Sequence, residues 1–390
     1  MKRPLRPPRR HSLPRGVTLI ELMVALLIGL VVVLAITNLL IAGEAQKRMT
    51  TSVNDREQTG AYAALLLDRA LRSAGSGLAW TAATGGYGCA LNAQKSGAVI
   101  LPSPGWPDPF TAFPNAPHLA PVLIQKGDAD ASDTLMVIAG SAAAGDVPRP
   151  VRGGSGSAAQ LDGTLQINGG DVLLLTGGGG DCLIEQVQDG FAGSQTQPTL
   201  PLGGAYYSAG SASTSLSSLL GGGAYLSELG SVSAGASPPS NPPQFMLYGV
   251  NGQGQLVDYD MLQTGPGNDA QPVADGVQKF YAVYGVDTDG DGKLDSWVSP
   301  EGVWSIASLS VDATRLKQIL AVRFALLLRS DLAEKQSVSQ QVVSSGAIKI
   351  FADAPAVART LSLSGDQQKY RYQLIDTVVP LRNALLVAAP

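Results

Sequence analysis

The longest feature in the pattern of apolar and polar positions is an apolar run from Val17 to Ala42. The run holds roughly 25 residues, and a helix of that length is long enough to cross a ~30 Å hydrocarbon core. Glu21 is its single charged residue and lies one helical turn from its start. A carboxylate inside a membrane costs at least ~2.5 kcal/mol on insertion scales, so we expect Glu21 to be functional and to need a partner.

After this run the pattern stays helical but narrows to one apolar stripe. Met49 and Val53 are four residues apart, as are Leu67 and Leu71, and charged residues cover the other faces. Such a stripe is typical of a helix that packs against a sheet. No proline interrupts the pattern before Gly75, which provides a stop. The sequence therefore predicts one long helix, apolar on all sides first and half-buried afterwards.

Short strand patterns follow, separated by stretches rich in Gly, Pro and Ser. We expect irregular loops at 81–121 and 140–164 and a flexible excursion at 203–243. The apolar residues 319–328 predict a buried strand or a short helix, preceded by a helical turn. The other predicted strands lie at 133–139, 171–176, 181–188, 244–250, 255–260, 277–286 and 371–379. The expected fold class is α+β, with the long helix packed on an antiparallel sheet.

Charge is distributed unevenly along the chain. The segment before Val17 carries six cations and no acid, namely Lys2, Arg3, Arg6, Arg9, Arg10 and Arg15. By the positive-inside rule this end stays cytoplasmic, which sends the C-terminal part outward. Without that segment, 21 basic residues face 31 acidic ones. We expect no nucleic-acid partner, because phosphate contacts need a basic surface.

The stretch from Gly16 to Glu21, G-V-T-L-I-E, followed by L-M-V-A-L, resembles the class III leader of type IV pilins and pseudopilins. The resemblance implies that prepilin peptidase cleaves after Gly16 and methylates the new amine of Val17. It also implies that Glu21 pairs with that amine on a neighbouring subunit, which would neutralise the carboxylate. Val17 stands where the family usually has phenylalanine. The alternative is a plain membrane anchor in which Glu21 has no role.

Three C-terminal segments are similar to the PilW-like minor pilins: VQKFYAVYGVDTDGDGKLDSW at 277–297, AVRFALLLRS at 321–330 and VVPLRN at 378–383. The resemblance implies a pilin-like head domain and a subunit that contacts other minor and major pilins through its N-terminal helix. It further implies a single pass through the inner membrane, a periplasmic head, and exposure on the pilus after assembly.

We divide the chain into six parts on this basis. They are the cytoplasmic leader 1–16, the membrane half of the helix 17–42, its amphipathic half 43–77, a loop-rich first part of the head 78–202, the flexible excursion 203–243 and a β-rich C-terminal part 244–390.

The two cysteines, Cys89 and Cys182, both follow the predicted membrane segment. Thiols are oxidised in the periplasm, so we expect a disulfide between them. The alternative is two unpaired thiols, because the sequence does not give the distance between them.

An acidic stretch, DTDGDGKLD at 287–295, matches the first half of a Ca²⁺-binding loop. Its candidate ligands are Asp287, Asp289, Asp291, the carbonyl of Lys293, and Asp295. Position 12 of such a loop is Val298, not the glutamate of an EF-hand, and the stretch follows a predicted strand. The sequence therefore indicates a strand-connecting loop with Ca²⁺ as the candidate cofactor. The alternative is an acidic hairpin turn, which D-G pairs also favour.

Signatures of enzymes are missing from the sequence. Once the leader is removed, His118 is the single histidine, and neither a G-x-S-x-G elbow nor an H-E-x-x-H motif is present. The glycines at 177–180 are not followed by Lys-Ser or Lys-Thr, which excludes a P-loop. We expect no enzymatic activity and no small-molecule substrate. A pseudopilin of a type II secretion system and an anchored Ca²⁺-dependent adhesin are the alternatives to a minor pilin.

Overall fold

The structure is a computed structural model that describes residues 16–128, 131–140, 147–177, 181–209, 215–221, 223–232, 241–263, 269–334 and 347–385. The predicted leader before Gly16 therefore lies outside the described residues. The chain divides into two compact units, residues 1–55 and residues 56–390, and each is described by itself. We call the second unit the head domain; it includes the last part of the N-terminal helix.

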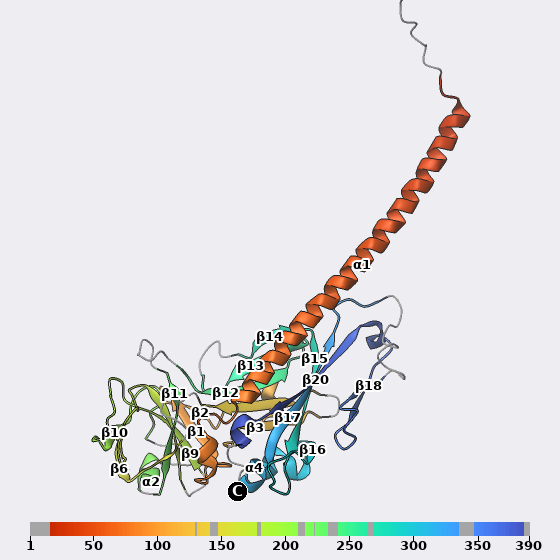
Figure 1. Ribbon diagram of the computed structural model, residues 1–390. Coiled ribbons are helices and arrows are strands. Elements are labelled where there is room, and N and C mark those ends of the chain that lie inside the picture. The colour runs from red at the N-terminus through yellow and green to blue at the C-terminus, as the bar shows by residue number, and fades with distance from the viewer. Residues whose placement is uncertain are drawn as a thin grey trace, which may run out of the picture. The chain divides into compact units, whose positions relative to one another are not determined.

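Helix α1 (Leu19–Ser73) is one continuous helix of 55 residues, as the apolar pattern predicted (Figure 1). In its first part the large apolar side chains from Leu19 to Ile41 are exposed around the whole helix. A segment that is apolar on all sides is typical of a helix that is surrounded by lipid or by other apolar helices. The helix ends before Gly75, whose φ of +74° is a left-handed conformation that glycine adopts at little cost.

The last part of α1 belongs to the head domain and packs by one stripe. Ala63, Leu67 and Leu71 are fully buried in the largest core cluster. Gly60 begins this stripe at a point where the helix lies close to the sheet. A Cβ at Gly60 would lie 2.7 Å from Cδ1 of Ile375 and 3.0 Å from Cδ2 of Leu328. Glycine is therefore needed here for close packing, although it disfavours the helix interior.

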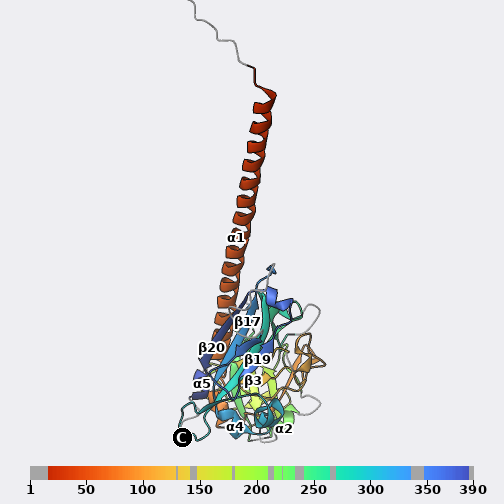
Figure 2. The same ribbon diagram turned by 90° about the vertical axis from the view of Figure 1, so that its right-hand side faces the viewer.

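This part of the helix packs against a four-stranded antiparallel sheet. Its strands, in spatial order, are β16 (Ser296–Val298), β15 (Val277–Val286), β17 (Ile319–Arg329) and β20 (Tyr372–Pro380). Figure 2 shows β17 and β20 side by side. The opposite face of the sheet packs on a second core cluster with the hairpin β18 (Ala347–Ile350) and β19 (Arg359–Ser362). The open choice between strand and helix at 319–328 is resolved as strand.

Two further sheets complete the main layers of the head. The five-stranded sheet has the order β14 (Gln271–Asp275), β13 (Gln255–Asp260), β12 (Gln244–Val250), β4 (Thr134–Ala139) and β3 (Val122–Gln125). The six-stranded sheet has the order β2 (Ala98–Leu101), β1 (Ala90–Lys95), β9 (Asp181–Gln186), β8 (Asp171–Thr176), β11 (Tyr225–Ser231) and β5 (Arg149–Pro150). Among the described strands, only β1 and β9 pair in parallel.

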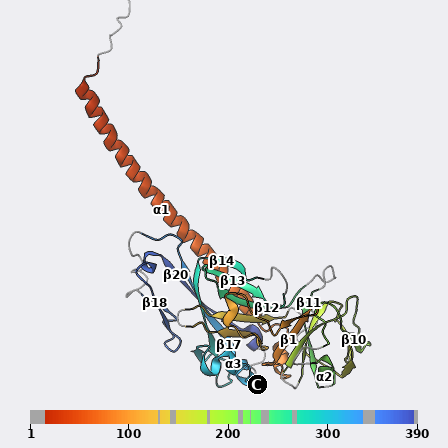
Figure 3. The same cartoon turned by 180° about the vertical axis from the view of Figure 1, so that it is seen from behind.

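Smaller elements surround these sheets. A three-stranded sheet has the order β10 (Thr199–Pro201), β7 (Ala158–Gln160) and β6 (Gly153–Ser155). The short α-helices are α2 (Leu216–Leu220), α3 (Ile306–Leu309), α4 (Ala313–Lys317) and α5 (Arg382–Leu385), and single 3₁₀ turns lie at Ala79–Ala82, Phe110–Ala112, Gly302–Trp304 and Gln367–Lys369. β10 and β18 lie at opposite ends of the head domain, as Figures 1 and 3 both show.

The α+β fold class is confirmed, with a long N-terminal helix followed by a mostly antiparallel β domain. Several strands lie in segments whose composition had predicted loops. β1 and β2 lie within 81–121, and β5, β6 and β7 lie within 140–164, both of which we expected to be loops. The expected flexible excursion at 203–243 contains α2 and the buried strand β11, while its residues 210–214, 222 and 233–240 lie outside the described part. Pairing with distant strands overrides the weak local propensity of these segments.

Candidate functional site

The predicted cleavage junction directly precedes the first turn of α1. Gly16 and Val17 are not helical, and 72% of Val17 is exposed. A Cβ added to Gly16 would meet no other atom within 4 Å. The bond between them therefore lies in an exposed segment outside regular structure, where a peptidase gains access without unfolding the helix.

Glu21 bonds with Thr18 at the start of the helix. The backbone N–H and the hydroxyl of Thr18 each donate to Oε2 of Glu21 at 3.2 Å. In return, the backbone N–H of Glu21 donates to Oγ1 of Thr18 at 3.3 Å. This reciprocal arrangement is a capping box, and it satisfies two N–H groups that the first turn would otherwise leave unpaired. The Thr-x-x-Glu spacing carries the signal in the sequence, but our interpretation of Glu21 through a neighbouring subunit missed it.

The rest of the first part of α1 offers no other charge. Val17 to Ala42 contains no Asp, Glu, Lys or Arg apart from Glu21. Among the described residues, α1 is the one helix that is long and apolar enough to cross a membrane. This statement is based on the length and composition of the helix, two properties that signal sequences and buried core helices can share.

The acidic loop at 287–295 connects β15 to β16 and brings three of its acids together. Asp287, Asp289 and Asp295 each offer one carboxylate oxygen, and these oxygens lie within 4.8 Å of one another. Asp287 is 2% exposed and accepts hydrogen bonds from the N–H groups of Gly290 (2.7 Å) and Gly292 (2.8 Å). Oxygen ligands of this kind suit Ca²⁺.

The other two candidate ligands of this loop bind each other. Nζ of Lys293 donates to Asp291 at 2.5 Å, and this hydrogen bond lowers the pKa of the Asp291 carboxyl. Hydrogen bonds from Thr288 lower the pKa of Asp295 in the same way, so this carboxylate stays ionised at neutral pH. The structure therefore brings the carboxylates of Asp287, Asp289 and Asp295 together, and the carboxylate of Asp291 binds Lys293 instead. A role for the Lys293 carbonyl stays a prediction.

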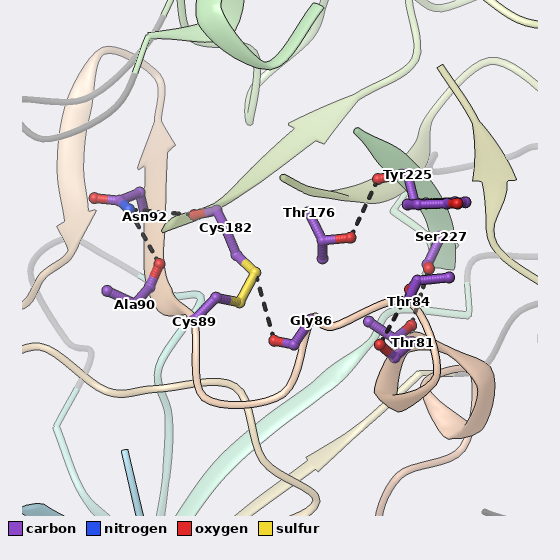
Figure 4. The surroundings of a disulfide bond; sticks show 10 residues. All are labelled: Thr81, Thr84, Gly86, Cys89, Ala90, Asn92, Thr176, Cys182, Tyr225 and Ser227. Atoms are coloured by element: carbon purple, nitrogen blue, oxygen red, sulfur yellow. Dashed lines mark hydrogen bonds between the residues drawn. A yellow bond between two sulfur atoms is a disulfide. The ribbon is translucent and has the colours of Figure 1, made fainter. Parts of the chain in front are cut away.

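Cys89 and Cys182 form a disulfide, with their Cα atoms 5.6 Å apart (Figure 4). Cys182 lies on β9, and Cys89 directly precedes β1, the parallel neighbour of β9. The Nδ2 group of Asn92 donates to the carbonyl of Cys182 at 3.2 Å, which adds a side-chain bond across the same pair of strands. The disulfide therefore fixes the segment after α1 to the six-stranded sheet.

Several buried charges of the head domain were not foreseen. Arg359 donates to both carboxylate oxygens of the fully buried Asp133 at 3.0 Å, which ties β19 to the loop before β4. Arg323 of β17 forms bidentate pairs with Asp353 and Asp376 and lies over the ring of Phe351. Arg323 thus links the segment between β18 and β19 to β17, and Arg359 links β19 to the loop before β4. A charge inside an apolar strand, as in ILAVRFALLLR, was the available signal.

Glu185 is a buried carboxyl on β9 with no exposed surface. Burial raises its pKa to about 8, and hydrogen bonds from the N–H and hydroxyl of Ser208 oppose that rise. Burial also lowers the pKa of His118, which favours its neutral form.

Two family models match the chain, one at each end. Residues 13–37 match the prokaryotic N-terminal methylation motif, and residues 245–383 match the type IV pilus-assembly protein W. No curated protein and no solved structure matches the chain. Type IV pilus-assembly families consist in general of structural proteins, and a leader of this kind on an apolar helix indicates membrane anchoring. The chain is thus similar to the prokaryotic N-terminal methylation motif over residues 13–37 and to the type IV pilus-assembly protein W over residues 245–383.

Proposed function

We propose that the protein is a minor pilin that takes part in type IV pilus assembly. Prepilin peptidase cleaves after Gly16 and methylates Val17, and α1 then leaves the inner membrane by packing against other pilin helices. The observation that carries this proposal is the match of residues 13–37 to the methylation motif, over a helix whose apolar side chains are exposed all round. A helix of this kind needs lipid or other apolar helices around it.

Glu21 sets the axial position of the subunit in this proposal. Cleavage creates a new N-terminal amine on each processed pilin, at Val17 in this chain. The helix of a neighbouring pilin presents its own N-terminal amine to Glu21 of this chain. A charge in a low-dielectric environment is tolerated when an opposite charge neutralises it. The capping box supplies hydrogen bonds to Glu21 but no positive charge, so the ion pair with a neighbour still adds stability.

The size of the head domain favours a low-copy position. Residues 56–390 form one compact unit, which is large for a subunit that has to repeat along a filament. A bulky head hinders close lateral packing of identical copies but is compatible with the tip or with a priming complex of minor pilins. In this proposal the head lies in the periplasm before assembly, where disulfides such as Cys89–Cys182 form.

Mass spectrometry of the mature N-terminus, with two substitutions, tests the proposal. We expect the native chain to begin at a methylated Val17 and Gly16→Ala to block processing. Glu21→Ala should be processed normally but lose pilus assembly. A chain that begins at Met1, or normal piliation with Glu21→Ala, would contradict the proposal.

A pseudopilin of a type II secretion system shares this leader and is the second candidate. The match of residues 245–383 to the pilus-assembly protein W favours the pilus. Deleting the gene separates the two, because loss of twitching motility with normal secretion supports the minor pilin, and the reverse supports the pseudopilin.

We also propose that the loop at 287–295 binds Ca²⁺ through Asp287, Asp289 and Asp295. Their oxygens lie within 4.8 Å of one another, and a cation would relieve the repulsion between these carboxylates. Thermal unfolding of the full chain with Ca²⁺ and with a chelator provides the test. Ca²⁺ should raise the unfolding temperature of the wild type and of Asp331→Asn, an exposed control, but not of Asp289→Asn. No shift in the wild type would remove the metal and the adhesin alternative with it.

A further inference from the structure

The edge strands of the head domain differ in how well they are protected against pairing with another chain. β16 has three residues, β5 has two, and β3 has four that are largely buried. β2 has four residues and shows a register shift, and β14 combines a register shift with Pro272. Short length, bulges and proline are the usual devices that protect an edge. β20 has none of them, since it runs for nine residues in unbroken register and carries proline only at its last position.

Two hydrogen bonds show which backbone groups of β20 face outward. Ser330 donates its N–H to the carbonyl of Arg371 at 2.9 Å, and Leu381 donates to the carbonyl of Leu320 at 2.8 Å, so these positions face β17. Backbone groups alternate between the two sides of a strand. Among the described strands β20 pairs with β17 alone, so no described strand pairs with its other side, which we call the open side. The residues whose backbone groups face this open side are Tyr372, Leu374, Asp376 and Val378.

The side chains along this edge do not repel an incoming strand. Val378 is 47% exposed, and no lysine occurs between Tyr372 and Pro380. Asp376 is the one charged residue of the strand, and Arg323 neutralises it with hydrogen bonds of 2.8 Å and 2.7 Å. Lysine and unpaired inward charges are further devices that discourage edge pairing, and β20 has neither.

β20 also lies against the part of α1 that belongs to the head domain. Nη1 of Arg56 donates to the carbonyl of Arg371 at 3.2 Å, and its Nε donates to Gln373 at 3.3 Å. Further along, Gly60 packs directly on Ile375. β20 is therefore a direct neighbour of the part of α1 that the head domain contains.

We propose that the outer edge of β20 pairs with an extended strand from the head of another pilin subunit. The pairing would add a fifth strand beside β20 through the N–H groups of Leu374, Asp376 and Val378, as in other cases of strand addition. This inference rests on the proposed function, because the neighbouring subunit is what α1 brings alongside. It adds a contact between head domains to the contact between helices.

Val378→Pro in the full chain, expressed with its own pilin partners, tests the backbone pairing. Proline removes the outward N–H of residue 378 without touching a hydrogen bond to β17, and edge strands tolerate it there. We expect about a tenfold loss of co-purifying pilin subunits, which corresponds to a lost hydrogen bond and an unsatisfied carbonyl on the partner. Val378→Thr keeps the N–H and should behave as the wild type. Wild-type recovery with Val378→Pro would overturn the inference.

A photo-crosslinking residue at position 378 provides the second measurement, since it does not depend on the proline variant folding. The expected product joins position 378 to a strand of another processed pilin, identified by mass spectrometry of the linked peptide. The same residue at Val311, which is 85% exposed and far along the chain, is the control. Links only to this chain itself, or none above the control, would overturn the edge pairing. If Glu21→Ala abolishes piliation at the same time, the proposed function stands without it.

Discussion

The two parts of helix α1 differ in where their apolar side chains find partners. In the first part, Leu27 and Leu30 are 66% and 71% exposed, and the same holds around the whole helix. In the last part, Leu67 and Leu71 are fully buried against the sheet of the head domain. One unbroken helix therefore contains a segment whose apolar side chains are buried by the chain itself and another whose apolar side chains are not.

This difference separates stability from assembly. Substitutions in the last part of α1 should change the free energy of unfolding of the head, because they remove contacts that the chain makes with itself. Substitutions in the first part should leave that free energy unchanged and affect the association with lipid or other helices instead. The following experiments use this contrast, from the largest expected effect to the smallest.

The most direct test is a pair of identical substitutions in the two parts. Leu67→Ala removes a fully buried side chain and should destabilise the head by about 2–5 kcal/mol. Leu27→Ala should change the same quantity by less than about 0.5 kcal/mol, because Leu27 contacts solvent in the single chain. Denaturant unfolding of the detergent-solubilised full chain measures both. Equal changes in the free energy of unfolding for the two substitutions would show that both parts of α1 contribute alike to the stability of the head.

Removal of the disulfide should destabilise the head domain without affecting the first part of α1. The double substitution Cys89→Ser and Cys182→Ser opens a loop with a sequence separation of 93 residues, which should cost about 2–4 kcal/mol. The helical signal of the first part of α1 should remain in circular dichroism while the head unfolds at lower denaturant. A chain whose unfolding midpoint does not move would contradict a stabilising role of this bond.

The buried Glu185 gives the head a pH dependence. Its folded pKa of about 8 lies above the value of 4.5 for an exposed glutamate. Between these values the folded state keeps a proton that the unfolded state has released, so stability falls as pH rises, by up to about 1.4 kcal/mol per pH unit. Glu185→Gln should flatten this decline between pH 5 and pH 8 in urea unfolding. An identical slope in both proteins would show that the carboxyl is already ionised in the folded state.

Gly60 marks the position where the helix meets the sheet, and its substitution should have the smallest effect. Gly60→Ala gains helix propensity of about 1 kcal/mol but places a Cβ 2.7 Å from Ile375. We expect a net loss of about 1 kcal/mol, which Ile375→Val should partly restore in a double-mutant cycle. Gly43→Ala in the first part should show no loss, since no atom lies within 4 Å of its position.

The sequence predicted best those elements that local pattern determines. α1 follows from an uninterrupted apolar run and a stripe, and β15 follows from a long apolar segment with β-branched and aromatic residues, while the pattern of β17 left strand and helix open. β1, with the sequence ALNAQK, and β11, with YLSELGS, have little intrinsic strand preference. They are strands because β9 and β8 pair with them from far along the chain.

The site residues divide in the same way. Gly16, Val17 and Glu21 were predicted from the resemblance to the class III leader, whose motif is contiguous in the sequence, and their roles stay predictions. The pairing of Asp291 with Lys293 and the bidentate contact of Arg359 with Asp133 depend on side-chain placement, which no local pattern contains. Thr18 is the exception. The Thr-x-x-Glu spacing of a capping box is present in the sequence, and this motif predicts the hydrogen bonds between Thr18 and Glu21.

In the proposed function, the bonds between Thr18 and Glu21 make the pairing of Glu21 with a neighbour's amine an exchange of hydrogen-bond partners. The carboxylate already has two donors in the solitary subunit, so a neighbour's amine displaces or shares them and contributes only the difference. Small net differences of this kind favour equilibria that run readily in both directions. If the proposed function holds, such a subunit would join a growing fibre and leave it again without exposing an unpaired charge.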